Sequence, residues 1–144
     1  MRTFRSLALS VALGAIGFVL VQSAHPAPVF AQAKESVFVN LTSDEPQRVT
    51  MALNFATKLV EGGNTVTLFL NVDGVRLAST KVATLSQQRR GLAAFMKAGG
   101  TVVICPHCMQ VRKVAESDLM AGLTMGGEGA ATQAFLSSPR SISY

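Results

Sequence analysis

Two kinds of apolar pattern alternate along residues 36–104. Short apolar runs rich in Val, Leu, Ile and Thr are typical of buried strands, and they cover residues 36–41, 65–71 and 101–104. Between them, residues 47–61 and 84–97 repeat apolar side chains at spacings of three and four, which predicts two amphipathic helices. A Gly-Gly pair closes each helix. This order predicts right-handed crossovers and a parallel sheet covered on both faces.

The remaining segments give weaker patterns. Thr42-Ser43-Asp44 offers oxygens suited to capping the first helix, and Pro46 fits its first turn. Residues 72–75 predict a loop, and residues 76–80 and 119–125 give no firm assignment. The other expectations are a short helix at 109–114, a capped turn at 116–118, a flexible break at 126–129, a last helix at 130–136 and an edge strand at 141–144.

The first 33 residues have the pattern of a secretory signal peptide. Arg2 and Arg5 precede an apolar run from Leu7 to Val21, and Ala31-Gln32-Ala33 provides a small-residue cleavage site. The run is shorter than the roughly 20 residues of a spanning helix, so cleavage after Ala33 is favoured over a retained anchor. We therefore predict a periplasmic or secreted protein without a stable membrane anchor, in which residues 34–144 form a single domain.

Composition and charge mainly exclude classes of function. Without the signal, 11 Lys and Arg remain against 8 Asp and Glu, so the formal charge falls from +5 to +3. The basic residues are scattered, which argues against a nucleic-acid partner. The sequence also lacks a Gly-x-Ser-x-Gly turn and a phosphate-binding glycine motif, so serine hydrolysis and nucleotide binding are poorly supported.

The candidate chemistry lies at Cys105-Pro106-His107-Cys108, which holds both cysteines of the chain. Cys105 ends the strand 101–104, and Pro106 fits the first position of a helix. A thiol at a helix start is favoured as the thiolate. A Cys-x-x-Cys bridge closes a small loop and therefore constrains the unfolded chain little, which argues for reactivity.

Topology predicts which other residues share this site. In parallel sheets, ligands bind beyond the carboxyl ends of the strands. The loops at this edge carry Thr42 and Ser43, then Asn71, Asp73 and Gly74, then Cys105 to Cys108. We expect these residues to line a crevice around Cys105, although Asn71 and Asp73 could also be turn residues.

Four motifs in order resemble the DsrE family of small sulfur-handling proteins. They are Val37 to Thr42, Met51 to Ala56, Phe69 to Val75 and Val103 to Met109. The resemblance implies a flavodoxin-like three-layer α/β sandwich, with a mostly parallel sheet of about five strands, that forms homo-oligomers. It also implies a cysteine after a strand that carries sulfane sulfur as a persulfide, and Cys105 matches that position.

On this reading Cys105 exchanges sulfur with a donor or acceptor protein or a small sulfur compound, and Cys108 is the resolving thiol. The best-characterised members of the family are cytoplasmic, whereas this chain has the pattern of an export signal. The sulfur-relay partners of those members are therefore not expected for this chain. No cofactor is implied. His107 either tunes Cys105 or is an ordinary exposed loop residue.

Two other functions remain open. The tetrapeptide Cys-Pro-His-Cys resembles the active site of the periplasmic oxidant DsbA, so the pair could be a thiol–disulfide redox couple. Alternatively, the chain is a non-catalytic oligomeric binding module with a structural disulfide. A metal site built on Cys105, His107 and Cys108 is disfavoured, because a closed zinc site needs four ligands and His107 is the only histidine after residue 33.

Overall fold

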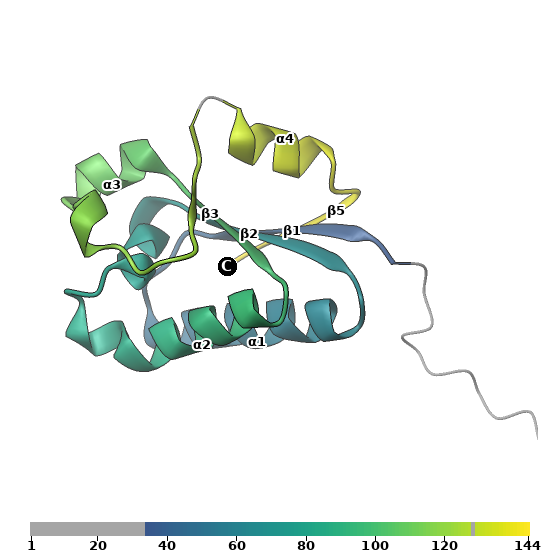
Figure 1. The fold of residues 1–144 in the computed structure, drawn as a ribbon, viewed down its shortest axis with the longest axis horizontal. Helices are drawn as coiled ribbons and strands as arrows, with labels where there is room; N and C mark the ends of the chain where they lie inside the picture. Colours follow the sequence, from purple (N-terminus) through teal and green to yellow (C-terminus); the bar gives the residue numbers. More distant parts are fainter. Residues whose placement is uncertain (1–33, 128) are drawn as a thin grey trace, which may run out of the picture.

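The computed structural model describes residues 34–127 and 129–144, so the predicted signal peptide lies outside the described residues. Five strands form one sheet in the order β4-β3-β2-β1-β5, and every neighbouring pair is parallel. Helices α1 and α2 cover one face of the sheet, and α3 and α4 lie on the other (Figure 1). This is the predicted flavodoxin-like α/β arrangement, and the fold class is confirmed.

The elements follow the sequence pattern closely. The strands are β1 (Ser36–Leu41), β2 (Thr65–Leu70), β3 (Thr101–Ile104), β4 (Thr124–Met125) and β5 (Arg140–Ser143). The α-helices are α1 (Pro46–Glu61), α2 (Ser86–Lys97), α3 (Pro106–Arg112) and α4 (Ala130–Leu136). Three 3₁₀ segments complete the fold: η1 (Val72–Ala78), η2 (Ala83–Leu85) and η3 (Glu116–Asp118).

The main core lies between the sheet and the pair α1 and α2. Alternate residues of β1, β2 and β3 point into it, because successive side chains of a strand face opposite sides. They meet the apolar stripes of the two helices, and Phe95 of α2 is fully buried. The core residues of these five elements are Val37, Val39, Leu41, Val66, Leu68, Leu70, Val102, Ile104, Val49, Ala52, Leu53, Ala56, Leu92 and Phe95.

The opposite face of the sheet is less completely covered. The short helix α4 crosses it and packs Phe135 edge-to-face on Phe38 of β1, with ring centres 5.6 Å apart. Phe135 is still 50% exposed and Leu136 76% exposed.

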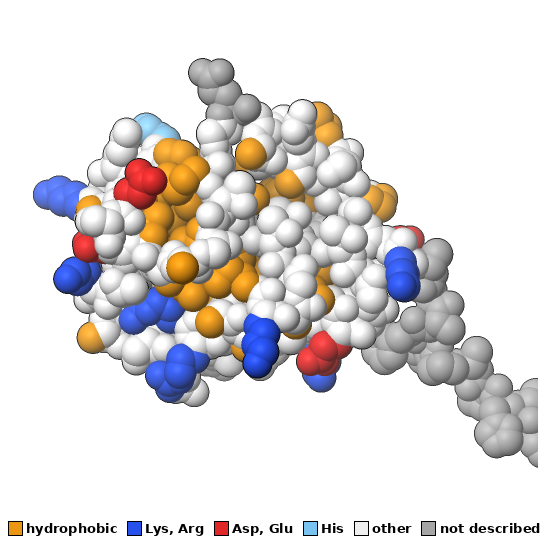
Figure 2. Space-filling view, viewed as in Figure 1, with side chains coloured by type: hydrophobic (Ala, Val, Ile, Leu, Met, Phe, Trp, Pro, Cys, Tyr) orange, Lys and Arg blue, Asp and Glu red, His pale blue; other side chains and the backbone are white. Residues whose placement is uncertain are grey.

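Seen from the side where residues 115–127 run, hydrophobic side chains gather beside α3 and Lys and Arg side chains lie around the rim (Figure 2).

Three local expectations are corrected. Helix α1 is capped by Glu45, not by Thr42-Ser43-Asp44, and its carboxylate accepts the backbone N–H groups of Gln47 and Arg48. These two bonds lower the pKa of the Glu45 carboxyl. The predicted loop 72–75 is the start of η1, which also contains part of the unassigned segment 76–80. Helix α3 (Pro106–Arg112) begins at the proline expected to start a helix, so it does not have the expected range 109–114.

The C-terminal strand is anchored at both of its ends. At the N-terminal end, Arg140 pairs with Glu35, which lowers the pKa of the glutamate and raises that of the arginine. At the other end, the Thr42 hydroxyl donates to the carbonyl of Tyr144 at 2.7 Å. The last residue is thereby placed beside the loop that follows β1. Within the described residues, no helix combines the length and apolar character needed to cross a membrane.

Candidate functional site

Cys105 lies at the carboxyl end of β3, where the sheet meets α3. Its backbone is still extended (φ −77°, ψ 110°), and its N–H donates to the carbonyl of Leu70 at 2.9 Å, so the β2–β3 ladder continues to the cysteine. Pro106 then begins α3, because a proline at this position loses only an N–H that has no partner within the helix. Cys105 is thus half-buried and fixed on its backbone by the sheet.

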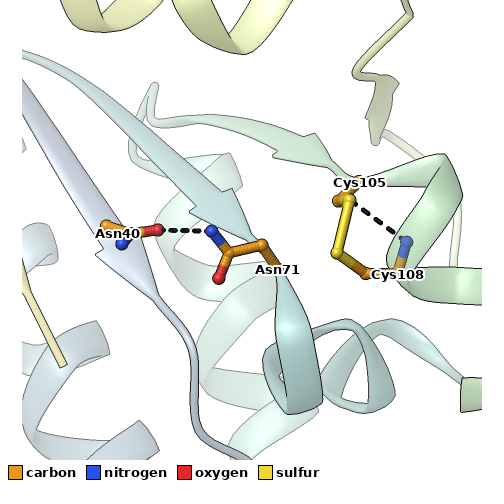
Figure 3. Close-up of a disulfide and its surroundings, with 4 residues drawn as sticks. All are labelled: Asn40, Asn71, Cys105 and Cys108. Carbon is orange, nitrogen blue, oxygen red and sulfur yellow. Dashed lines mark hydrogen bonds between the residues drawn. A yellow bond between two sulfur atoms is a disulfide. The ribbon is translucent and has the colours of Figure 1, made fainter. Parts of the chain in front are cut away.

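Cys105 and Cys108 are joined by a disulfide across the first turn of α3 (Figure 3). Their Cα atoms are 5.3 Å apart. The Cys108 N–H also donates to Cys105 Sγ at 3.1 Å. This hydrogen bond would favour a thiolate at Cys105 in the reduced pair, since a donor aimed at a sulfur stabilises its charged form.

The two neighbours of Cys105 in the sheet are Asn71 and Gly126. Leu70 pairs with Ile104, and Met125 pairs with Ile104 on the other side, so the next residues along each strand flank the cysteine. Gly126 donates its N–H to the Ile104 carbonyl at 2.8 Å, and a Cβ there would lie 2.8 Å from the same oxygen. A glycine is needed for this close approach beside the disulfide.

Asn71 belongs to a small polar chain that runs away from the disulfide. Its Nδ2 donates to Asn40 Oδ1 at 2.9 Å, and Asn40 Nδ2 donates to Ser143 Oγ at 3.3 Å. Figure 3 shows Asn71 between Asn40 and the Cys105–Cys108 pair. Asn71 Oδ1 is buried and has no hydrogen-bond partner within residues 34–127 and 129–144.

The segment after Asn71 is tightly constrained. Val72 has a positive φ of 49°, which is a strained conformation for a β-branched residue. The Asn71 N–H donates to the Leu41 carbonyl at 3.1 Å, and the Asp73 N–H donates to the Thr42 carbonyl at 3.0 Å. These two bonds on either side of Val72 hold the strained residue in place.

An ion pair ties the cysteine helix to this loop. Arg112, at the end of α3, contacts Asp73 through Nε–Oδ1 at 2.8 Å and Nη2–Oδ2 at 3.1 Å. The contact is therefore bidentate, the geometry that makes an arginine–carboxylate pair directional. Asp73 thus has a clear structural role, which is to hold α3 against η1.

The other predicted site residues have local roles in the structure. The Ser43 hydroxyl accepts the Glu45 N–H at 3.1 Å, and Thr42 contacts Asp73, Gly74 and Tyr144 through backbone or hydroxyl bonds. His107 is exposed on α3. Among residues 34–127 and 129–144, no three Cys, His, Asp or Glu side chains gather so as to hold a metal ion.

Sequence reasoning missed Asn40, Arg112 and the phenylalanines of the far sheet face. Asn40 had a signal, since it is a polar residue near the end of an otherwise apolar strand. Arg112 had none, because its partner Asp73 is 39 residues away in the chain.

A profile of the DsrE/DsrF-like family matches residues 35–144, which is most of the chain and includes the whole site. The chain belongs to the DsrE/DsrF-like family. This family is generally related to sulfur relay. Among curated proteins, none matches the chain.

Two solved structures share the fold. The ychN protein from E. coli superposes with a TM-score of 0.60 at 20% sequence identity, covering 78% of this chain and 100% of that chain. The protein of unknown function MTH1491 from Methanobacterium thermoautotrophicum gives a TM-score of 0.62 at 14% identity, covering 75% and 97%. At these identities the likeness shows the fold alone.

Proposed function

We propose that this DsrE/DsrF-like protein carries sulfane sulfur as a persulfide on Cys105 and that Cys108 is the resolving thiol. The observation that carries the proposal is the Cys105–Cys108 pair itself. One sulfur is placed at the end of a central strand, and the other lies close enough to bond with it. Family membership supports sulfur as the cargo.

Loading would begin from the reduced pair. The Cys105 thiolate attacks the terminal sulfur of a persulfide donor R–S–SH, the donor S–S bond breaks, and RS⁻ leaves and takes a proton to become RSH. The product is Cys105–S–SH. The Cys108 N–H that contacts Cys105 Sγ at 3.1 Å would stabilise the attacking thiolate.

Release would use the second cysteine. The Cys108 thiolate attacks Cys105 Sγ, the bond to the outer sulfur breaks, and that sulfur leaves as HS⁻. The two thiols have then given two electrons to the sulfane sulfur, and the product is the Cys105–Cys108 disulfide that the structure holds. A dithiol reductant would restore the reduced pair and be oxidised to a disulfide itself.

Intact-mass spectrometry of the reduced protein after incubation with inorganic polysulfide tests the proposal. We expect a mass gain in multiples of one sulfur, about 32 Da, on the wild-type protein. Cys105→Ser should abolish the gain, and Cys108→Ser should prolong its lifetime because release by disulfide closure is lost. Cys105→Ser/Cys108→Ser is the thiol-free control, since the chain has only these two cysteines.

A thiol–disulfide redox couple is the second candidate, and the closed disulfide favours it. In that case the wild-type protein would cycle only between dithiol and disulfide, losing two hydrogens and never holding sulfur. If neither cysteine reacts with polysulfide or with a dithiol, both proposals fail and the disulfide has a structural role.

We also propose that the protein works outside the cytoplasm. The N-terminal pattern of residues 1–33 and a disulfide between the chain's two cysteines both fit an oxidising compartment. The same mass measurement, made on protein expressed with its full N-terminus, should give a chain that starts at Lys34. A full-length mass from the exported fraction would contradict cleavage after Ala33.

A further inference from the structure

A hollow of ≈ 300 Å³ lies between α4 and the sheet, on the face opposite the main core. Three phenyl rings line it: Phe38 from β1, Phe69 from β2 and Phe135 from α4. Phe38 lies 6.0 Å from Phe69 and 5.6 Å from Phe135, measured between ring centres. The hollow therefore has aromatic walls that come from three separate elements.

The polar groups among the described lining residues are uncharged amides and hydroxyls. Asn40 and Asn71 contribute amides, and Thr132, Ser141 and Ser143 contribute hydroxyls; among the described residues, no Lys, Arg, Asp, Glu or His lines the hollow. A mostly apolar cavity of this size with a few polar groups is typical of small-molecule sites. Without a cationic side chain, the hollow is poorly suited to an anion, whose desolvation would remain uncompensated.

Asn71 links the hollow to the cysteines. It lines the hollow and follows β2, while Cys105 occupies the adjacent position after β3, and the Cys105 N–H bonds to Leu70. Adjacent strands are about 4.8 Å apart, and both residues have extended backbones and follow core-facing residues. Their side chains therefore start from the same face of the sheet, next to each other.

The Asn71 amide is also incompletely bonded. Its Nδ2 is held by Asn40, but its buried Oδ1 has no hydrogen-bond partner among the described residues. A buried acceptor without a donor costs free energy. Because Asn71 lines the hollow, a ligand N–H, O–H or S–H that reached this oxygen could donate to it.

We propose that the hollow binds the uncharged organic group of the sulfur donor, R in R–S–SH, and of the thiol RSH that leaves. The substrate class is a small organic persulfide with an apolar or aromatic body and a hydrogen-bond donor. This inference rests on the proposed function, because the hollow would place the sulfur end of the donor beside Cys105. The transfer is the loading step written above, in which RSH is the second product.

Binding is measured first, without any sulfur chemistry. The Cys105→Ser/Cys108→Ser protein is titrated with benzyl alcohol, an uncharged ring with an O–H donor, and with benzoate, an anion of similar shape, while amide resonances are followed by NMR. We expect benzyl alcohol to shift resonances of β1, β2 and α4, and benzoate to have no effect. Phe135→Ala should weaken benzyl alcohol binding about tenfold.

The chain offers two matched controls on the opposite face. Phe55 on α1 is 43% exposed, close to the 50% of Phe135, so Phe55→Ala should leave binding unchanged. Asn54 is an exposed residue of α1, so Asn54→Ala is the matched control for Asn71→Ala. Of these two asparagine variants, only Asn71→Ala should weaken benzyl alcohol binding.

Transfer is measured second, by intact mass on the reduced protein. Loading of Cys105 from benzyl persulfide should slow about tenfold in Phe135→Ala, whereas loading from inorganic polysulfide should not change. Equal loading by both donors in this variant would overturn the proposal that the hollow binds the donor, and it would leave the carrier function intact. Benzyl alcohol binding without loading from either donor would overturn the carrier function instead.

Failure of benzyl alcohol to bind, or equal weakening by Phe55→Ala and Phe135→Ala, would also overturn the proposal. If Phe135→Ala then lowers the molecular mass in light scattering, the hollow is part of a contact between copies of the chain.

Discussion

At the end of β1, the Leu41 carbonyl leaves no room for a side chain at position 74. A Cβ added to Gly74 would lie 2.2 Å from the Leu41 oxygen and 3.0 Å from its carbonyl carbon, distances that require a backbone shift. The Gly74 N–H donates to the Asn71 carbonyl at 2.8 Å, so the same shift would disturb the loop beside Cys105. Gly74, expected to line the site, is needed for this backbone approach.

We therefore expect Gly74→Ala to lower the free energy of unfolding by about 1–3 kcal/mol, the usual cost of overpacking. Urea unfolding followed by circular dichroism measures it. Gly127→Ala is the control, because a Cβ there would meet no atom of the described residues within 4 Å, its chain neighbours aside, and its stability should stay within about 0.5 kcal/mol of the wild type. Equal stability of the two variants would show that Leu41 and Gly74 can separate at little cost.

At the scale of single elements, α1 depends on one carboxylate. Glu45 accepts the N–H groups of Gln47 at 2.9 Å and Arg48 at 2.7 Å, which satisfies two of the donors that an α-helix leaves unpaired at its start. These bonds favour the charged form, so the pKa of Glu45 is lower in the folded protein than its ordinary value of 4.5. The stability that this difference supplies is present above the ordinary value and is lost as the pH falls through the folded value.

Glu45→Gln should therefore lower Tm at about pH 7 and lower it less at about pH 3, because the stability that the lowered pKa supplies declines once the pH is below the ordinary value of 4.5. Calorimetry at both pH values measures the two differences. Glu61→Gln, in the last turn of the same helix and paired at the surface with Lys58, is the control and should change Tm only slightly at either pH. A Glu45→Gln deficit that is equally large at both pH values would mean that the charge of Glu45 contributes nothing.

Elements with a strong local pattern could be predicted from the sequence, and those defined by distant contacts could not. Strands β1 to β3 and helices α1 and α2 have apolar periods that hold over a whole element. The two-residue strand β4 exists only because Thr124 and Met125 pair with Val103 and Ile104, so the segment 119–125 gave no assignment. The start of α3 was indicated by Pro106, which fits the first helical position, whereas the range 109–114 expected for this helix was wrong at both ends.

At the scale of the whole molecule, the position of Cys105 followed from the order of strands and helices, whereas its surroundings did not. A parallel sheet places the residues after β1, β2 and β3 at one edge, which correctly located the loops. The contacts Asp73–Arg112 and Asn40–Asn71 depend on how loops and strands from distant parts of the sequence pack. The hollow also requires α4 to cross the far face and place Phe135 on Phe38, which no local pattern specifies.

Self-association is the last property of the whole molecule that we predict. Met51 and Phe55 lie one turn apart on α1, so they share one side of the helix, and they are 56% and 43% exposed. An apolar pair on a long surface helix is costly to leave in water. We propose that a second copy of the chain covers this pair, in line with the homo-oligomers that the resemblance to the DsrE family implies.

Met51→Glu/Phe55→Glu should then convert an oligomer into a monomer in size-exclusion chromatography with light scattering, because two carboxylates would be buried without partners. Leu136→Glu is the matched control, since Leu136 is 76% exposed on α4 at the other side of the sheet, and it should leave the mass unchanged. A monomeric wild-type protein would contradict self-association. Dissociation by Leu136→Glu alone would show that the copies of the chain meet at α4. Such an interface would compete with the sulfur donor for the hollow beneath that helix.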